Sequence, residues 1–232
     1  MNIAVFGANG PTGRLLTKQA LAEGHAVTAV TRHPDTFPLR HEGLRVLPGD
    51  VFDLAAVERA IAGQDAVLST LGAPFSRKPI TVYSRGAENI LRAMDRYGVR
   101  RFVCVSSSAA DEHLEPQGGI IFGRVLQPLI MGVFGRTLYD DMRRMEALVE
   151  RSDVDWTIIR PSGLFATPTV TSYRVADIHL PARYTSRTDL ADCMLRQLTD
   201  DRFVRKIASV ATVSEQPNML AFIWKEALGK SA

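Results

Sequence analysis

The glycine-rich stretch Gly7-Ala8-Asn9-Gly10-Pro11-Thr12-Gly13 constrains the fold of this chain more than any other feature. It lies between an apolar run at 2–6, which predicts a buried strand, and a helical pattern at 12–23. Gly7 permits a sharp turn, Gly10 lets a phosphate approach the backbone, and Gly13 lets the helix pack closely. The free N–H groups at the start of such a helix attract phosphate. A nucleotide phosphate site is therefore favoured over a plain glycine turn, with contacts from Gly7, Asn9, Gly10, Pro11, Thr12 and Gly13.

Short apolar runs alternate with helical patterns along the rest of the chain. The expected strands are 2–6, 26–31, 44–47, 66–70, 101–106, 155–160 and 206–211, and the expected helices are 12–23, 54–62, 82–97, 139–151, 188–198 and 218–228. Such repetition predicts parallel strands with helices on both faces of one sheet. We therefore expect an α/β fold: a single NAD(P)-binding domain over 1–232, with one doubly wound, Rossmann-like parallel sheet and a small C-terminal substrate-binding elaboration.

Two segments, 111–135 and 167–181, interrupt this alternation. Both follow expected strands, and ligands of open parallel sheets bind beyond the carboxyl ends of the strands. We expect the substrate pocket to be built from about 111–135 and 162–187. The apolar stretch 120–134, together with Leu164 and Phe165, is interpreted either as a wall for a flat ligand or as ordinary core or a dimer face. His113 and His179 lie in these segments, as proton donors or as surface residues.

Composition limits the class of protein. The 232 residues are 46% hydrophobic and carry a net charge of +3 without a block of like charges, so no nucleic-acid partner is expected. Cys104 and Cys193 lie in apolar surroundings without metal-site spacing, so we expect buried free thiols and no metal. The chain starts without a signal-peptide pattern, and its longest apolar stretch is too short and interrupted to span a membrane. A cytoplasmic protein, monomeric or homodimeric, with no membrane partner is expected.

Arg32 stands at the end of the second expected strand, where many dinucleotide-binding folds place an acid. That acid accepts hydrogen bonds from the ribose hydroxyls of NAD. A guanidinium instead suits a 2′-phosphate, because it carries a permanent charge and forked donors. Arg14, one residue past the last glycine, is placed to join it. We therefore expect NADP(H), with NAD(H) less favoured; the alternative is a solvated surface arginine.

Other cofactor contacts are expected where later strands end. Asp50 is a candidate for the adenine edge, with a turn-forming aspartate as the equal alternative. The backbone of 69–73 would run beside the ribose and nicotinamide, and Ser106-Ser107-Ser108 would face the same crevice. The residues expected at these strand ends are Asp50, Val51, Thr70, Leu71, Gly72, Ser106 and Pro161.

Several motifs together resemble the atypical short-chain dehydrogenase/reductases, in the NmrA-like, NAD(P)H-binding group. The pattern is nearest to the biliverdin reductase B and flavin reductase type. The motifs that carry this resemblance extend over nearly the whole chain: FGANGPTG, GQDAVLSTLG, SRGAENILRAM, GVRRFVCVSSS, YDDMRRMEALVERSDVDWTIIRPSGL and TSRTDLADCMLRQL.

The resemblance implies an NADPH-dependent oxidoreductase that passes hydride to a flat conjugated acceptor: a flavin, a quinone or an aromatic metabolite. It also implies an active-site role for Ser107, whose alternative is to satisfy local backbone. Many short-chain dehydrogenases pair a catalytic tyrosine with a lysine four residues on. Here that pair is Tyr139 and Arg143, which disfavours the usual acid–base route. The two are kept as catalytic candidates, with an interfacial aromatic as the alternative for Tyr139.

The chain also departs from the biliverdin reductase B pattern. The loop after Gly72 reads Ala73-Pro74-Phe75 where the relative has an arginine nearby, and Ser162 stands where the relative has a pocket histidine. These departures argue against biliverdin as the substrate and affect the hydride-transfer assignment less. The altered tyrosine pair leaves a second hypothesis, that the chain is an NmrA-like redox sensor that binds NADP(H) without turnover.

Overall fold

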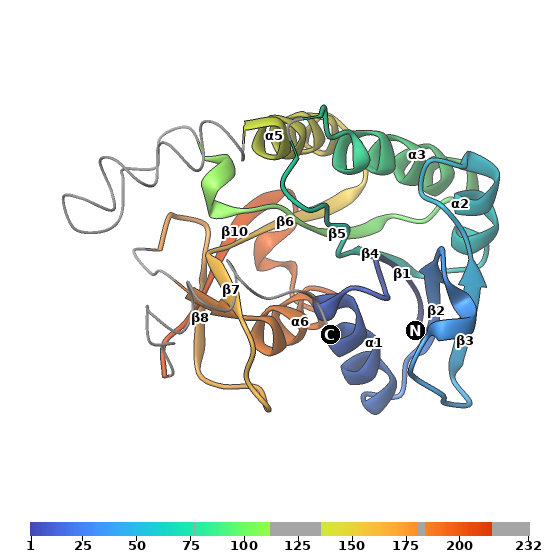
Figure 1. Ribbon diagram of the computed structural model, residues 1–232, viewed down its shortest axis with the longest axis horizontal. Coiled ribbons are helices and arrows are strands. Elements are labelled where there is room, and N and C mark those ends of the chain that lie inside the picture. Colours follow the sequence, from blue (N-terminus) through green and yellow to red (C-terminus); the bar gives the residue numbers. More distant parts are fainter. Residues whose placement is uncertain (77, 112–135, 181–183, 215–232) are drawn as a thin grey trace.

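An eight-stranded sheet forms the centre of the computed structural model, which describes residues 1–76, 78–111, 136–180 and 184–214 (Figure 1). The strand order is β3-β2-β1-β4-β5-β6-β10-β8, and neighbouring strands are parallel except for β8, which pairs antiparallel with β10. These strands are β1 Asn2–Phe6, β2 Ala26–Thr31, β3 Leu44–Pro48, β4 Ala66–Ser69, β5 Arg101–Val105, β6 Asp155–Pro161, β8 Tyr173–Ala176 and β10 Lys206–Thr212. The expected α/β, Rossmann-like fold is confirmed.

Helices cover both faces of the sheet (Figure 1). They are α1 Pro11–Ala22, α2 Leu54–Ile61, α3 Val82–Tyr97, α5 Arg136–Glu150 and α6 Arg187–Arg196. Helix α1 packs against α6 on one face, while α3 packs against both α2 and α5 on the other. Each face buries its own hydrophobic cluster, because the central strands are apolar on both sides. This double covering is what continuous Val- and Ile-rich runs predict.

Local chemistry sets the ends of two helices on the same face of the sheet. Gly98 closes α3 in the left-handed region, with φ of 67°, where a side chain would be strained. Asp53 caps α2, because its side chain accepts a hydrogen bond from the Ala55 N–H. Asp53 thus starts the helix that follows β3, and Gly98 ends the helix that precedes β5.

The C-terminal half contains elements that the sequence analysis did not predict. Part of the segment 167–181, expected to be irregular, forms β8 at the edge of the sheet. Two further strands, β7 Gly163–Phe165 and β9 Tyr184–Ser186, pair in parallel as a separate small sheet. The described part of α5 starts at Arg136, so the helix already includes the three residues before its expected start. The expected helix 218–228, the apolar stretch 120–134 and His113 lie outside the described residues.

The strand order reverses direction between β1 and β4, which lie side by side at the centre of the sheet. Chain segments leaving the carboxyl ends of these two strands go to opposite faces, α1 on one side and α3 on the other. In open parallel sheets this switch point forms the ligand-binding crevice. The glycine-rich stretch and the segment 69–73 both begin there.

Candidate functional site

The glycine loop after β1 is built on backbone contacts that exclude side chains. Gly7 has φ of 75°, and a Cβ on it would lie 2.6 Å from the Thr70 carbonyl oxygen of the neighbouring strand end. A Cβ on Gly13 would lie 2.2 Å from the Gly7 carbonyl oxygen and 2.8 Å from the Ala8 Cα. Gly13 therefore packs the first turn of α1 against the loop itself, not only against the strand. Both glycines are required by close approach of backbone to backbone.

The start of α1 lacks a side-chain cap. Gly10 is the N-cap residue, Pro11 is the first helical residue, and the first turn contains no acid. Asn9 instead accepts a hydrogen bond from the Arg14 Nε at 3.0 Å, which holds both side chains over the loop. Because the first N–H groups of a helix carry partial positive charge and seek acceptors, this uncapped end suits an anion.

The end of β4 is tied to the end of β1 through Thr70. Its N–H donates to the Phe6 carbonyl at 2.9 Å, and its hydroxyl lies 3.2 Å from the carbonyl oxygens of both Phe6 and Gly7. Beyond Thr70 and Leu71, a Cβ on Gly72 would meet nothing within 4 Å. The predicted residues Gly7, Thr70 and Gly72 are thus brought together at the switch point, with open space against the Gly72 backbone.

Tyr83, which the sequence analysis missed, fastens the segment that follows. Its phenol oxygen accepts a hydrogen bond from the Ala73 N–H at 3.2 Å, and the Asp141 carboxylate accepts one from the Tyr83 N–H at 2.9 Å. Asp141 is fully buried and also accepts from Ser84, so α5 supplies the cap for the start of α3. A network from α5 through α3 therefore positions the backbone just beyond Gly72.

Replacing Tyr83 with phenylalanine is expected to change how stability depends on pH. Burial, opposed by the Ala73 hydrogen bond and aided by the Asp141 charge, raises the pKa of Tyr83 to about 12. Because the folded state holds this proton more tightly than the unfolded state, its contribution is complete below about pH 10 and is lost as the pH rises toward 12. Tyr83→Phe should lose about 1 kcal/mol at neutral pH, because the Ala73 N–H loses its partner.

Urea denaturation of both proteins between pH 7 and pH 12 measures this effect. The variant should be the less stable protein at pH 7, and the difference should shrink as the pH rises through 10 to 12. A difference that stays constant with pH would contradict a buried, protonated phenol at this position.

The loop after β3 contains both residues predicted for the adenine side. Asp50 accepts a hydrogen bond from the Phe52 N–H at 3.0 Å. Asp50 therefore forms the turn that was expected as the alternative to a contact with the adenine edge. Val51 is buried, and its carbonyl accepts a hydrogen bond from the Asn89 side chain of α3 at 2.8 Å. Gly86, which the sequence analysis missed, lets α3 approach this loop: a Cβ there would lie 2.8 Å from Leu71 and 3.0 Å from Val51.

Arg32 is exposed directly after β2, as the sequence predicts. Within the described residues it makes no hydrogen bond or ion pair, whereas the neighbouring His33 N–H is bound by the Thr31 hydroxyl. The guanidinium is therefore available to an anionic ligand. Arg14, also exposed, keeps its Nε on Asn9.

The serines after β5 differ in how they are satisfied. Ser106 is buried, its N–H donates to the Ile159 carbonyl, and its hydroxyl has no hydrogen-bond partner among the described residues. Ser107 accepts a hydrogen bond from the Ala109 N–H at 3.2 Å. This is the alternative role expected for Ser107, in which it satisfies the local backbone. That contact uses the Ser107 oxygen only as an acceptor, so its O–H proton is left for another group.

Tyr139 and Arg143 lie one turn apart on α5, the spacing of the tyrosine–lysine pair. Burial raises the pKa of Tyr139, so the phenol stays protonated. Arg143 is paired with Asp140 at 2.5 Å and lies 3.5 Å from the Ala110 carbonyl oxygen. Whether Tyr139 and Arg143 take part in catalysis stays a prediction.

A half-buried ion cluster joins the ends of β5 and β6 to α5. Arg160 on β6 donates two hydrogen bonds to Glu146 of α5, at 2.9 and 2.8 Å, and a third to Asp111 at 3.1 Å. Burial alone lowers the pKa of Arg160, but hydrogen bonding and charge attraction from Glu146 and the Asp111 charge leave it raised. The following residue Pro161 is buried. The sequence analysis did not predict this cluster. It fixes the carboxyl end of β6, which Ser162 follows.

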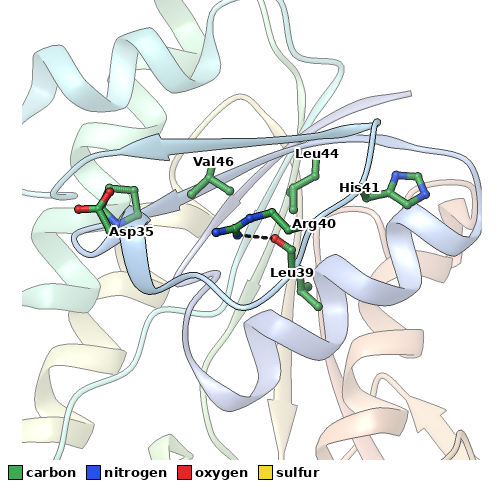
Figure 2. Close-up of a pocket in the computed structure, with 7 residues that line it drawn as sticks. Asp35, Leu39, Arg40, His41, Leu44 and Val46 are labelled. Atoms are coloured by element: carbon green, nitrogen blue, oxygen red, sulfur yellow. Dashed lines mark hydrogen bonds between the residues drawn. The ribbon is translucent and has the colours of Figure 1, made fainter.

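A hollow with a volume of about 440 Å³ lies between β3 and the segment 34–41, which begins two residues after Arg32. Figure 2 shows its lining, in which Arg40 lies between Asp35 and His41, with Val46 and Leu44 beside it. The Arg40 guanidinium donates to the carbonyls of Phe37 and Leu39, at 2.6 and 2.8 Å. Its charge is therefore already engaged by the backbone of its own loop.

Two expected absences concern only the part of the chain that the structure describes. In it, no three acidic, histidine or cysteine side chains are grouped as a metal site would require. Its helices are each too short or too polar to cross a membrane. Cys104 and Cys193 are buried free thiols, as predicted, and His179 is exposed beyond β8.

Comparison with known proteins bears directly on the glycine loop and the strands around it. A family model described as NAD(P)H-binding matches residues 7–201, which includes the loop, Arg32 and all the predicted strand-end positions. The match confirms, at the level of the family, the resemblance that the sequence motifs carry.

Similar proteins include reductases and an assembly factor. Photosystem II assembly factor Ycf39 from Synechocystis is 25% identical over 219 residues, which are 89% of this chain and 61% of that protein. The chain spans less than two thirds of the length of several such curated relatives. A short-chain dehydrogenase/reductase from Veillonella parvula in complex with NADP has a TM-score of 0.76 at 19% identity, over 92% of this chain and 95% of that one. ChuY, an anaerobillin reductase from Escherichia coli O157:H7, has a TM-score of 0.75 at 20% identity, over 94% and 100%.

Proposed function

The chain belongs to the NAD(P)H-binding family, and we propose that it is an NADPH-dependent reductase of a flat conjugated acceptor such as a flavin, a quinone or an aromatic metabolite. The reduced nicotinamide supplies the hydride when the cofactor is bound. The protein's own task is to hold two planar rings in register and to exclude competing groups. Nothing in this task needs an activated tyrosine, which fits the raised pKa of Tyr139.

The observation that carries the proposal is the cradle at the switch point. Gly7 and Gly13 bring the loop backbone closer than any side chain allows, and the start of α1 has no side-chain cap or acid. The buried Ser106 hydroxyl, without a partner among the described residues, is a further polar group that a ligand would satisfy. These three features fit a dinucleotide with its pyrophosphate at the start of α1.

Individual residues receive roles from their places in this crevice. The glycine loop would hold the pyrophosphate, Arg32 the 2′-phosphate, and the Asp50-Val51 turn the adenine side. The backbone of Thr70, Leu71 and Gly72 would border the ribose and nicotinamide. The free Ser107 proton would orient the acceptor or the nicotinamide amide, and the proton needed by the reduced acceptor would come from solvent.

A second function is favoured by one specific comparison. Ycf39 is named an assembly factor, so the family fold occurs in a protein that is not named for turnover. An NADP(H)-binding sensor would use the same cradle and Arg32 without needing an acceptor pocket. ChuY and its name as a reductase support the enzyme as the leading candidate. Turnover with an acceptor separates the two.

The preference for NADPH is tested by replacing Arg32 with alanine. We expect NADPH affinity to fall about tenfold or more, because charge-assisted hydrogen bonds to the 2′-phosphate are lost, while NADH affinity changes less than about twofold. Titrations followed by protein fluorescence give both constants. The matched control is Arg45→Ala, which removes another exposed arginine, from β3, and should leave both affinities unchanged. Equal losses of NADPH and NADH affinity would rule out a 2′-phosphate contact at Arg32.

A further inference from the structure

We propose that Phe75, with Tyr139 behind it, forms an aromatic platform against which the acceptor ring stacks, so that Phe75 determines specificity for planar acceptors. The inference rests on the proposed function, because it assigns the acceptor side of the same crevice.

Phe75 is exposed to solvent, although its ring is restrained by contact with another aromatic ring. Its side chain is 57% exposed, and its ring meets the Tyr139 ring edge-on, with centroids 6.5 Å apart and planes inclined by 64°. Such an exposed ring contributes little to the core, and a ligand that covered it would remove apolar surface from water. Edge-to-face contact with Tyr139 restrains the direction of the Phe75 ring.

The loop that carries Phe75 is fixed on both sides of it. Before Phe75, the Ala73 N–H donates to the Tyr83 phenol of α3 at 3.2 Å. After it, the Ser76 carbonyl accepts a hydrogen bond from the Thr137 hydroxyl of α5 at 2.8 Å. An exposed aromatic ring on a loop held by two helices is pre-organised for binding, because little conformational entropy remains to be lost.

The aromatic platform borders the crevice on the side of α3 and α5. Phe75 follows Gly72 by three residues, so their Cα atoms lie within about 11 Å of one another. Tyr139 packs with Leu71 and Ala73 against the same hydrophobic cluster. The platform therefore stands beside the strand end where the nicotinamide is proposed to lie, as an acceptor-binding surface must.

The chemistry of the platform selects a planar, conjugated ring. Tyr139 is held neutral, since burial raises its pKa, and the Arg143 charge one turn away is compensated by Asp140 at 2.5 Å. The two rings themselves carry no charge, so the platform offers neutral aromatic contact to a flat ring. Stacking of a flat ring on such side chains favours flavins and quinones over small aliphatic carbonyl compounds.

Binding of riboflavin to protein saturated with NADP⁺ tests the platform, because no hydride is available in that state. Phe75→Ala should weaken riboflavin binding about tenfold, measured by flavin fluorescence, while Phe75→Trp should retain it. The matched control is Tyr97→Ala, which removes an exposed aromatic at the last position of α3, at the end of the helix away from the Phe75 loop. It should bind riboflavin as the wild type does, and all three variants should keep the wild-type affinity for NADP⁺.

Equal riboflavin binding by the wild type and Phe75→Ala overturns the inference and leaves the proposed function intact. Absence of riboflavin binding by the wild type also overturns it. The proposed function is then decided separately, by oxidation of NADPH in the presence of menadione. A loss of NADP⁺ affinity in Phe75→Ala would place Phe75 in the cofactor site and likewise contradict an acceptor role.

Discussion

Gly13→Ala is expected to abolish measurable NADPH binding, with affinity reduced about a hundredfold or more. The new Cβ would lie 2.2 Å from the Gly7 carbonyl oxygen and 2.8 Å from the Ala8 Cα, and both neighbours are backbone that cannot rotate away. The loop and the first turn of α1 must separate, so the N–H groups that the pyrophosphate needs move apart. Such overpacking should also cost about 1–3 kcal/mol of unfolding free energy.

Gly63→Ala is the matched control for Gly13→Ala. Gly63 has φ of 75°, so alanine there is strained, but its Cβ would meet nothing within 4 Å. It should cost about 1–2 kcal/mol of stability and leave NADPH affinity unchanged. Isothermal titration with NADPH, with urea denaturation of the same samples, separates the two effects. Wild-type NADPH affinity in Gly13→Ala would contradict a phosphate-binding role for this loop.

Glu146→Ala is expected to cost about 3–5 kcal/mol of unfolding free energy, more than either glycine substitution. Glu146 is 5% exposed, and it accepts two hydrogen bonds from Arg160, whose side chain is also largely enclosed. Removing the carboxylate leaves the guanidinium with Asp111 as its one remaining ion-pair partner among the described residues. The end of β6 and the start of the segment after it lose their anchor to α5.

Urea denaturation measures this loss, and Glu58→Ala serves as its control. Glu58 also pairs with an arginine, Arg96 at 2.9 Å, but that guanidinium is exposed to water. Its removal should hardly move the denaturation midpoint, because solvent screens exposed pairs. The double variant Glu146→Leu/Arg160→Met should recover part of the stability lost in Glu146→Ala, because neither charge is then left buried alone. Equal, small effects of Glu146→Ala and Glu58→Ala would contradict a structural role for the cluster.

The parallel part of the sheet was predictable because each of its strands is a short apolar run between turn residues. The small strands β7, β8 and β9 were not, because they are three or four residues long and their pairing partners lie far along the chain. Strand β8, for example, reads Tyr-Arg-Val-Ala and is held by β10, about 35 residues later. Tertiary pairing decided these elements, not local preference.

The glycine loop was predictable from residue type alone, since only glycine permits the contacts around Gly7 and Gly13. The side chains that position the site were harder to predict from the sequence, because their hydrogen-bond and ion-pair partners come from other helices and strands. Arg160 meets Glu146 and Asp111 only once α5 packs beside β6, and Tyr83 reaches Ala73 only through the turn into α3. An arginine inside an otherwise apolar strand is the one signal that could have indicated a carboxylate partner. The roles of Ser107, Tyr139 and Arg143 stay predictions.

The central claim is that this fold binds NADPH and reduces a planar acceptor with it. Its most direct test is to titrate the purified protein with NADPH and NADH, and then to follow NADPH absorbance with riboflavin, FMN and menadione. We expect tighter binding of NADPH than of NADH, and oxidation of NADPH that depends on the acceptor. Binding of NADPH without turnover on any acceptor would favour the sensor. Failure to bind either nucleotide would contradict the claim, because it would remove the phosphate-binding role of the loop that begins at Gly7.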